Sequence, residues 1–153
     1  MTTLPAVAAK ARWAENWLIS NQSFPTRLVA LAAVDGILFS GSFCAICWLK
    51  KLGLIARDEG LHAEFACALY TLLEQRLSDE EPTTIIRGAV DVERAPICEA
   101  RPCSLIGMNA DLMARCIEFV ADRLLTVLGH LKTFHALESV SMDGPHLPPR
   151  QDQ

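Results

Sequence analysis

Glu59 and His62 are three residues apart in the segment RDEGLHAEF, and residue types at this spacing could bind a metal ion. Side chains three positions apart on an α-helix lie on the same side, so a carboxylate and an imidazole can hold one ion together. Glu-x-x-His motifs of this kind supply ligands in two-metal sites built inside helical bundles. Taken alone, such a pair is more commonly a salt-bridging surface glutamate beside an unrelated histidine.

Asp35 adds a third candidate ligand from another part of the chain. It is the single acidic residue in the apolar run from Leu28 to Leu49. An ionised carboxylate in such a run is costly to desolvate unless it has a partner, and a metal ion would be one. In helical two-metal sites, two helices each give one carboxylate and two others each give a Glu-x-x-His. Asp35, Glu59 and His62 therefore predict half of such a site.

The elements that would position these residues are all expected to be helices. Apolar periodicity, Pro25, Gly53 and Gly129 predict an all-α chain with no convincing strand. The predicted helices span Pro5 to Ile19, Thr26 toward Lys51, about Leu54 to Leu77, Thr83 to Ala95 before a break or kink at Pro96, and a last helix capped by Asn109 that ends near Gly129.

Helix lengths predict a register problem for the three candidate ligands. Asp35 is eighteen residues before Gly53, about 27 Å of helix, whereas Glu59 is six residues after it, about 9 Å. The two carboxylates would then miss each other by more than a turn. To share an ion, the helix that carries Asp35 must end early, near Cys44 to Trp48.

Longer stretches resemble a known family. The blocks AVDGILFSGSF (33–43), WLKK (48–51), RDEGLHAEFAC (57–67), LIGMNADLM (105–113) and IEFVADRL (117–124) occur in this order. They resemble the small, radical-bearing subunit of class I ribonucleotide reductase. The resemblance covers roughly Lys10 to Phe134 and corresponds to the C-terminal half of that subunit. It implies a truncated ferritin-like bundle, with a partial helical domain at 1–134 and a disordered C-terminal tail at 135–153.

The resemblance also implies roles for individual residues. Glu59 and His62 match iron ligands of the family, and Asp35 stands where the family has a glutamate ligand. Asp58, next to Arg57, resembles the aspartate that links the iron site to the radical-transfer chain. The implied cofactor is iron, as a di-iron site, and the family reduces ribonucleotides to deoxyribonucleotides. Asp35 is one methylene shorter than glutamate, about 1.5 Å of reach.

The family's other half would supply another carboxylate, another Glu-x-x-His and the radical-storing tyrosine. The only tyrosine here is Tyr70, which is predicted to pack in the core. We therefore assign no catalytic residue and expect the lone chain to be catalytically incompetent. The alternative function is that of a non-catalytic partner of a full-length small subunit. A homodimer in which two copies of Asp35, Glu59 and His62 face each other is a further hypothesis.

Composition limits the other partners and the compartment. The net charge is −4 and the basic residues are scattered, which argues against nucleic-acid binding. Six cysteines without a signal peptide indicate the cytoplasm, and Cys44 and Cys47 are interpreted as buried apolar residues. The segment from Pro145 to Arg150 replaces most of the family's docking tail, so docking to the large subunit is not expected.

A rival hypothesis is a single membrane span. Leu28 to Leu49 is 22 residues long and is flanked by Arg27 and by Lys50 and Lys51. Against this hypothesis, Asp35 near the bilayer centre would cost about 2.5 to 3.5 kcal/mol. The family resemblance explains the same run as the buried helix of a bundle, so no membrane association is expected.

Overall fold

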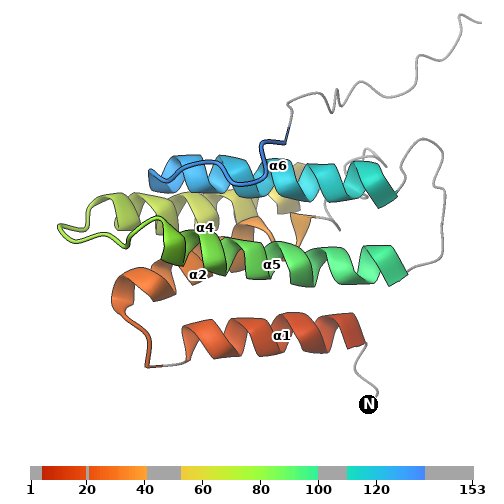
Figure 1. Cartoon of the computed structure of the whole chain (residues 1–153), viewed down its shortest axis with the longest axis horizontal. Helices are drawn as coiled ribbons and strands as arrows, with labels where there is room; N and C mark the ends of the chain where they lie inside the picture. The colour runs from red at the N-terminus through yellow and green to blue at the C-terminus, as the bar shows by residue number, and fades with distance from the viewer. Residues whose placement is uncertain (1–4, 20, 41–52, 100–109, 137–153) are drawn as a thin grey trace, which may run out of the picture.

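The computed structural model describes residues 5–19, 21–40, 53–99 and 110–136, and among these it describes no side chains at 53–60 and 97–99. Five helices and no strand make up this part of the chain, which confirms the all-α prediction. They are α1 (Pro5–Leu18), α2 (Phe24–Gly36), α4 (Gly53–Thr71), α5 (Glu80–Glu99) and α6 (Ala110–Leu128). The helices lie roughly side by side in a bundle (Figure 1).

Helix α2 is the central helix of the bundle. Its first turn is fixed by Ser23, whose side chain accepts a hydrogen bond from the Thr26 amide at 3.3 Å, and by Pro25 in the first turn. Most of its length is buried, and Val29, Ala30 and Ala33 are fully inaccessible to solvent. The small alanines allow neighbouring helices to approach closely on several sides.

The predicted extension of this helix toward Lys51 is wrong, because α2 ends at Gly36. The amides of Ile37 and Leu38 both donate to the Ala33 carbonyl, at 2.9 and 3.3 Å, and the Ser40 hydroxyl donates to the Ile37 carbonyl at 2.7 Å. These short-range bonds satisfy the last turn and direct the chain out of the helix. Residues 41–52, which include Cys44 and Cys47, lie outside the described part.

Helix α4 ends at Thr71 and not near Leu77 as predicted. Arg76 donates to the Thr71 carbonyl at 2.6 Å, and the Leu77 amide donates to the Tyr70 hydroxyl at 3.1 Å. Residues 72–79 therefore fold back on the end of α4 instead of extending it. Tyr70 is completely buried, which confirms its prediction as a core residue.

Helix α5 runs from Glu80 to Glu99 and contains Pro96, so a break at that residue is wrong, whereas the predicted alternative of a kink there stays a prediction. An ion pair between Arg94 and Glu118, 2.6 Å long, joins this part of α5 to α6. Packing against α6 supports the helix where proline removes one backbone hydrogen bond.

Helix α6 ends at Leu128, and Gly129 follows with φ +87°, which confirms the predicted end of the last helix. Asn109, the predicted cap at its start, lies outside the described residues. After α6 the chain runs back along the helix (Figure 1). The buried Asp122 carboxylate accepts from the amides of Thr133, Phe134 and Ala136 at 2.9 to 3.0 Å and holds this segment. Most of the predicted tail, from 137 onward, lies outside the described part.

The apolar run proposed as a membrane span begins in α2, which has only 13 residues. Within the described ranges, none of the helices combines the length and the apolar character that crossing a bilayer requires.

Candidate metal half-site

Asp35 and His62 lie at the same level of the bundle. A Cβ atom added to Gly36, the last residue of α2, would lie 3.7 Å from the Ala63 Cβ of α4. Asp35 is the residue before Gly36 on α2, and His62 is the residue before Ala63 on α4. The premise of the predicted mismatch, one helix running from Asp35 to near Gly53, is wrong because α2 ends at Gly36. The mismatch between Asp35 and Glu59 itself stays a prediction, because the Glu59 side chain lies outside the described part.

Both residues belong to the side of the α2–α4 pair that α6 does not cover. Gly36 faces Ala63 and Leu124, so α6 packs on one side of the contact. Asp35 is one residue, about 100° of helical rotation, from that direction, and it is half-buried. His62 is exposed, whereas Ala63, Ala66 and Cys67 form the buried face of α4.

The remaining predicted site residues belong to the first half of α4. Glu59 lies in this helix three residues before His62, and Arg57 and Asp58 lie beside it. Their side chains are outside the described part. The helical backbone between Glu59 and His62 is the feature that the Glu-x-x-His pattern requires.

Asp35 and His62 carry side-chain types that can bind a metal ion. A carboxylate from one helix and a histidine from the next are the ligand chemistry of helical di-metal sites. Among the side chains that the structure describes, no three His, Cys, Asp or Glu residues gather closely enough to hold an ion. Of the three predicted ligands, Asp35 and His62 are the two whose side chains the structure describes.

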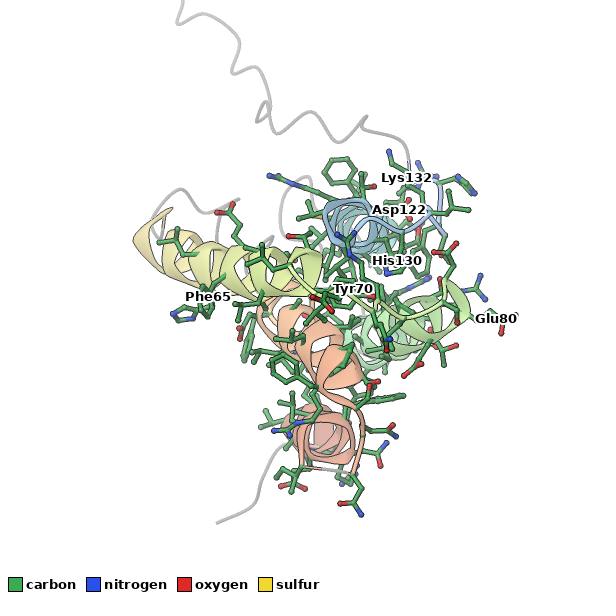
Figure 2. All side chains as sticks on the ribbon, turned by 90° about the vertical axis from the view of Figure 1, so that its left-hand side faces the viewer. Phe65, Tyr70, Glu80, Asp122, His130 and Lys132 are labelled. Atoms are coloured by element: carbon green, nitrogen blue, oxygen red, sulfur yellow. The ribbon has the colours of Figure 1, made fainter. Side chains whose placement is uncertain are left out.

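Exposed apolar side chains lie on the same two helices as Asp35 and His62. Leu61 and Phe65 of α4 are 55% and 64% exposed, and Leu31 of α2, four residues before Asp35, is 38% exposed. We call the surface formed by Leu31, Asp35, Leu61, His62 and Phe65 the open face. Figure 2 shows Phe65 projecting from α4 away from α6, which carries Asp122.

A cavity of about 340 Å³ lies on the other side of α4, between α4 and α6. Its lining includes Cys67, Leu124, Glu64 and Arg123. Burial raises the pKa of the Cys67 thiol to about 11, with the Glu64 carboxylate adding to the shift. The thiol is therefore protonated at neutral pH and is a poor nucleophile or metal ligand.

Sequence reasoning assigned no role to His130, but the structure places it in a hydrogen-bonded chain with Tyr70 and Asp79. The Tyr70 hydroxyl is 2.9 Å from His130 Nε2, and His130 Nδ1 is 2.6 Å from the Asp79 carboxylate. The Leu77 amide already donates to the Tyr70 oxygen. In a neutral histidine, Nδ1 then carries the proton that Asp79 accepts, and Tyr70 donates to Nε2.

These contacts join segments that are 51 to 60 residues apart in sequence. Figure 2 shows Tyr70 and His130 near each other, with Phe65 farther along α4. The network is thus separate from the open face and connects the end of α4 to the end of α6.

The bundle of five helices in the described part defines the class as a ferritin-like all-α fold. The family model described as "Ribonucleotide reductase, small chain" matches residues 1–140. This chain belongs to the ribonucleotide reductase small-chain family. The fold class and family expected from the sequence blocks are both confirmed.

Proteins from plants and protists are similar to this chain over most of its length. The chain is 50% identical to the ribonucleoside-diphosphate reductase small chain of Nicotiana tabacum, over 93% of this chain and 48% of that protein. It is 52% identical to the corresponding protein of Plasmodium falciparum (isolate Dd2), over 87% of this chain and 41% of that protein. The chain therefore spans about half the length of the curated relatives that it matches.

A solved structure gives the same result for the fold. The ribonucleotide reductase Rnr4 homodimer from Saccharomyces cerevisiae superposes with a TM-score of 0.81 and 31% identity, covering 91% of this chain and 48% of that chain. The bundle described above thus corresponds to about half of a chain with the small-subunit fold.

Proposed function

We propose that this chain is a small-subunit-like protein of ribonucleotide reductase that provides half of a di-iron site and is catalytically incompetent alone. The observation that supports the proposal is the common level of Asp35 and His62 across the Gly36–Ala63 contact. Glu59, one turn before His62 in α4, is the third proposed ligand. Iron bound here would supply the oxygen and redox chemistry of the family.

The proposed role of the chain's own residues is to hold and orient the metal. Asp35 approaches from the last turn of α2, whose other sides are fixed in the core, so its backbone is well anchored. Because aspartate is shorter than glutamate, and metal–oxygen distances tolerate only about 0.2 Å of error, α2 must approach α4 closely. The fit of Gly36 against Ala63 provides such an approach.

Incompetence of the lone chain rests on its ligand count and its tyrosine. The three proposed ligands are half of the helical di-metal set. Tyr70, the only tyrosine of the sequence, is buried in the core and is hydrogen-bonded to His130. Arg57 and Asp58 keep their proposed place in radical transfer only within a complete subunit.

The test is anaerobic titration with Fe²⁺, followed by calorimetry, in the wild-type chain and two histidine variants. The wild type is expected to bind about one ion per chain, and His62→Ala is expected to weaken binding by tenfold or more, or about 1.4 kcal/mol. His135→Asn is the matched control, because it removes an exposed imidazole away from α2 and α4 and asparagine tolerates the positive φ of 51° there. Equal binding by wild type and His62→Ala would contradict the proposal.

A second candidate function is non-catalytic pairing with a full-length small subunit. The observation that favours it is the exposed apolar surface formed by Leu61 and Phe65. Large exposed apolar side chains gathered on one helix face are typical of protein-binding surfaces. We also propose that the chain is located in the cytoplasm and that it does not dock to the large subunit.

A further inference from the structure

The cavity between α4 and α6 is lined by none of the proposed metal ligands. Its volume of about 340 Å³ is near the lower end of the range of about 300 to 1,000 Å³ that small-molecule sites have. Much of its wall is apolar and is formed by Ala63 and Cys67 of α4 and by Phe119, Val120 and Leu124 of α6. An apolar cavity of this size suits one small organic molecule.

Two opposite charges line the same cavity from different helices. Glu64 belongs to α4 and Arg123 belongs to α6, and both residues are exposed. Among the residues that the structure describes, neither side chain forms an ion pair or a hydrogen bond. The Glu64 carboxylate is close enough to the buried Cys67 thiol to help raise the pKa of that thiol. The negative charge therefore acts on the wall of the cavity itself.

The positive charge on the α6 side is reinforced by a second basic residue. Arg123 also lines a neighbouring cavity of about 320 Å³, together with Lys132 and Asp122. The Asp122 carboxylate is buried and already accepts hydrogen bonds from three backbone amides after α6. Arg123 and Lys132 thus make the α6 side of the cavity attractive to an anionic group, whereas Glu64 makes the α4 side attractive to a cationic group.

This pattern of charge selects among small apolar ligands. A ligand with a single carboxylate would face Glu64, and a ligand with a single ammonium group would face Arg123. A dipolar ion satisfies both residues at once and leaves its apolar part for the walls formed by Phe119 and Leu124. A free α-amino acid with a large apolar side chain has this combination of groups in a molecule of suitable size.

We propose that the cavity between α4 and α6 binds a free α-amino acid with a large apolar side chain. The ligand carboxylate pairs with Arg123, the ligand ammonium group pairs with Glu64, and the side chain enters the apolar part beside Leu124. The proposed site shares no residue with the proposed metal half-site. Its success or failure therefore leaves the proposed function untouched.

The experiment is a titration of the isotope-labelled 153-residue chain with L-leucine and with L-phenylalanine, followed by two-dimensional amide NMR. N-acetyl-L-leucine lacks the ammonium group, and L-leucine methyl ester lacks the carboxylate, so each tests one charge. Glu64→Gln and Arg123→Gln test the same charges on the protein. Glu74→Gln and Arg87→Gln are matched controls, because both residues are exposed and neither lines the cavity. Circular dichroism verifies that each variant keeps its helices.

We expect saturable shifts at the amides of Ala63, Cys67 and Leu124 for at least one of the two amino acids, with a dissociation constant on the order of 1 mM. Each charge variant, and each ligand without one charge, is expected to weaken binding about fivefold or more, whereas the control variants bind as the wild type does. No saturable shift at about ten times that concentration would overturn the proposal. Equal binding of the acetylated or esterified ligand, or unchanged binding in Glu64→Gln and Arg123→Gln, would overturn it as well.

Discussion

At the residue scale, the clearest result is that two side chains predicted as ligands from different segments lie at one level. Asp35 stands out because it is the single acid in an apolar run, and His62 because of its spacing from Glu59. Those signals depend on local composition and helical periodicity, which sequence carries directly. The contact of Gly36 with Ala63 then sets their common level, and it depends on tertiary packing.

The hydrogen-bonded chain of Tyr70, His130 and Asp79 shows what residue-level reasoning missed. The place of Tyr70 in an apolar helix predicts a core residue, and Tyr70 is fully buried. Its hydroxyl still needs partners, because a buried polar group without a hydrogen bond is costly. The partner His130 is 60 residues away, and no spacing pattern within one helix indicates it.

Tyr70 gives a direct prediction for pH dependence. Burial raises the pKa of its hydroxyl above the ordinary value of 10.0, with Glu81 and Asp79 adding to the shift and with the Leu77 amide and Arg76 opposing it. The folded state therefore retains the proton more strongly than the unfolded state. The free energy of unfolding is expected to fall as the pH rises above about 10.

Absorbance at 295 nm measures this ionisation, and the signal comes from Tyr70 alone because the chain has one tyrosine. The expected midpoint lies above 10 in the native protein and returns to about 10 in denaturant. A native midpoint at or below the denatured one would contradict the buried, histidine-bonded hydroxyl.

At the element scale, the predicted helices that are correct are those with strong boundary signals of their own. The start of α2 follows from Ser23 and Pro25, and the end of α6 follows from Gly129. The predicted ends of α2 and α4 are wrong because these ends depend on contacts made after the helix. The Ala33 carbonyl accepts hydrogen bonds from two amides after α2, and the Tyr70 hydroxyl accepts one from the Leu77 amide after α4.

Pro96 provides a prediction for α5. The helix continues past this residue to Glu99, although proline has no amide to donate to the carbonyl four residues earlier. Pro96→Ala is expected to raise the free energy of unfolding, by about 1 to 3 kcal/mol, because it restores that hydrogen bond and relieves the ring clash. Urea unfolding followed by circular dichroism at 222 nm measures the change.

A Pro96→Ala variant that is less stable than the wild type would indicate that the proline ends the helix, as the sequence alone suggests. Ala95→Gly, one residue earlier and exposed, is a useful comparison. Glycine there should cost about 1 kcal/mol if the segment is helical.

At the scale of the whole molecule, the bundle corresponds to about half of a small-subunit chain. The sequence blocks are sufficient to predict the family and the all-α fold, because each block combines a helical pattern with characteristic residues. The uncovered α2–α4 surface is a consequence of which helices the described part contains. That Leu61 and Phe65 are exposed follows from the packing of the helices, which the sequence pattern alone does not give.

The central claim is that Asp35, Glu59 and His62 share one metal site. The most direct measurement is an anomalous difference map, recorded at the iron absorption edge, from crystals of the protein soaked anaerobically with Fe²⁺. We expect an iron peak between the end of α2 and the His62 turn of α4, which is absent in His62→Ala crystals. No peak there, or iron bound only elsewhere on the protein, would contradict the claim.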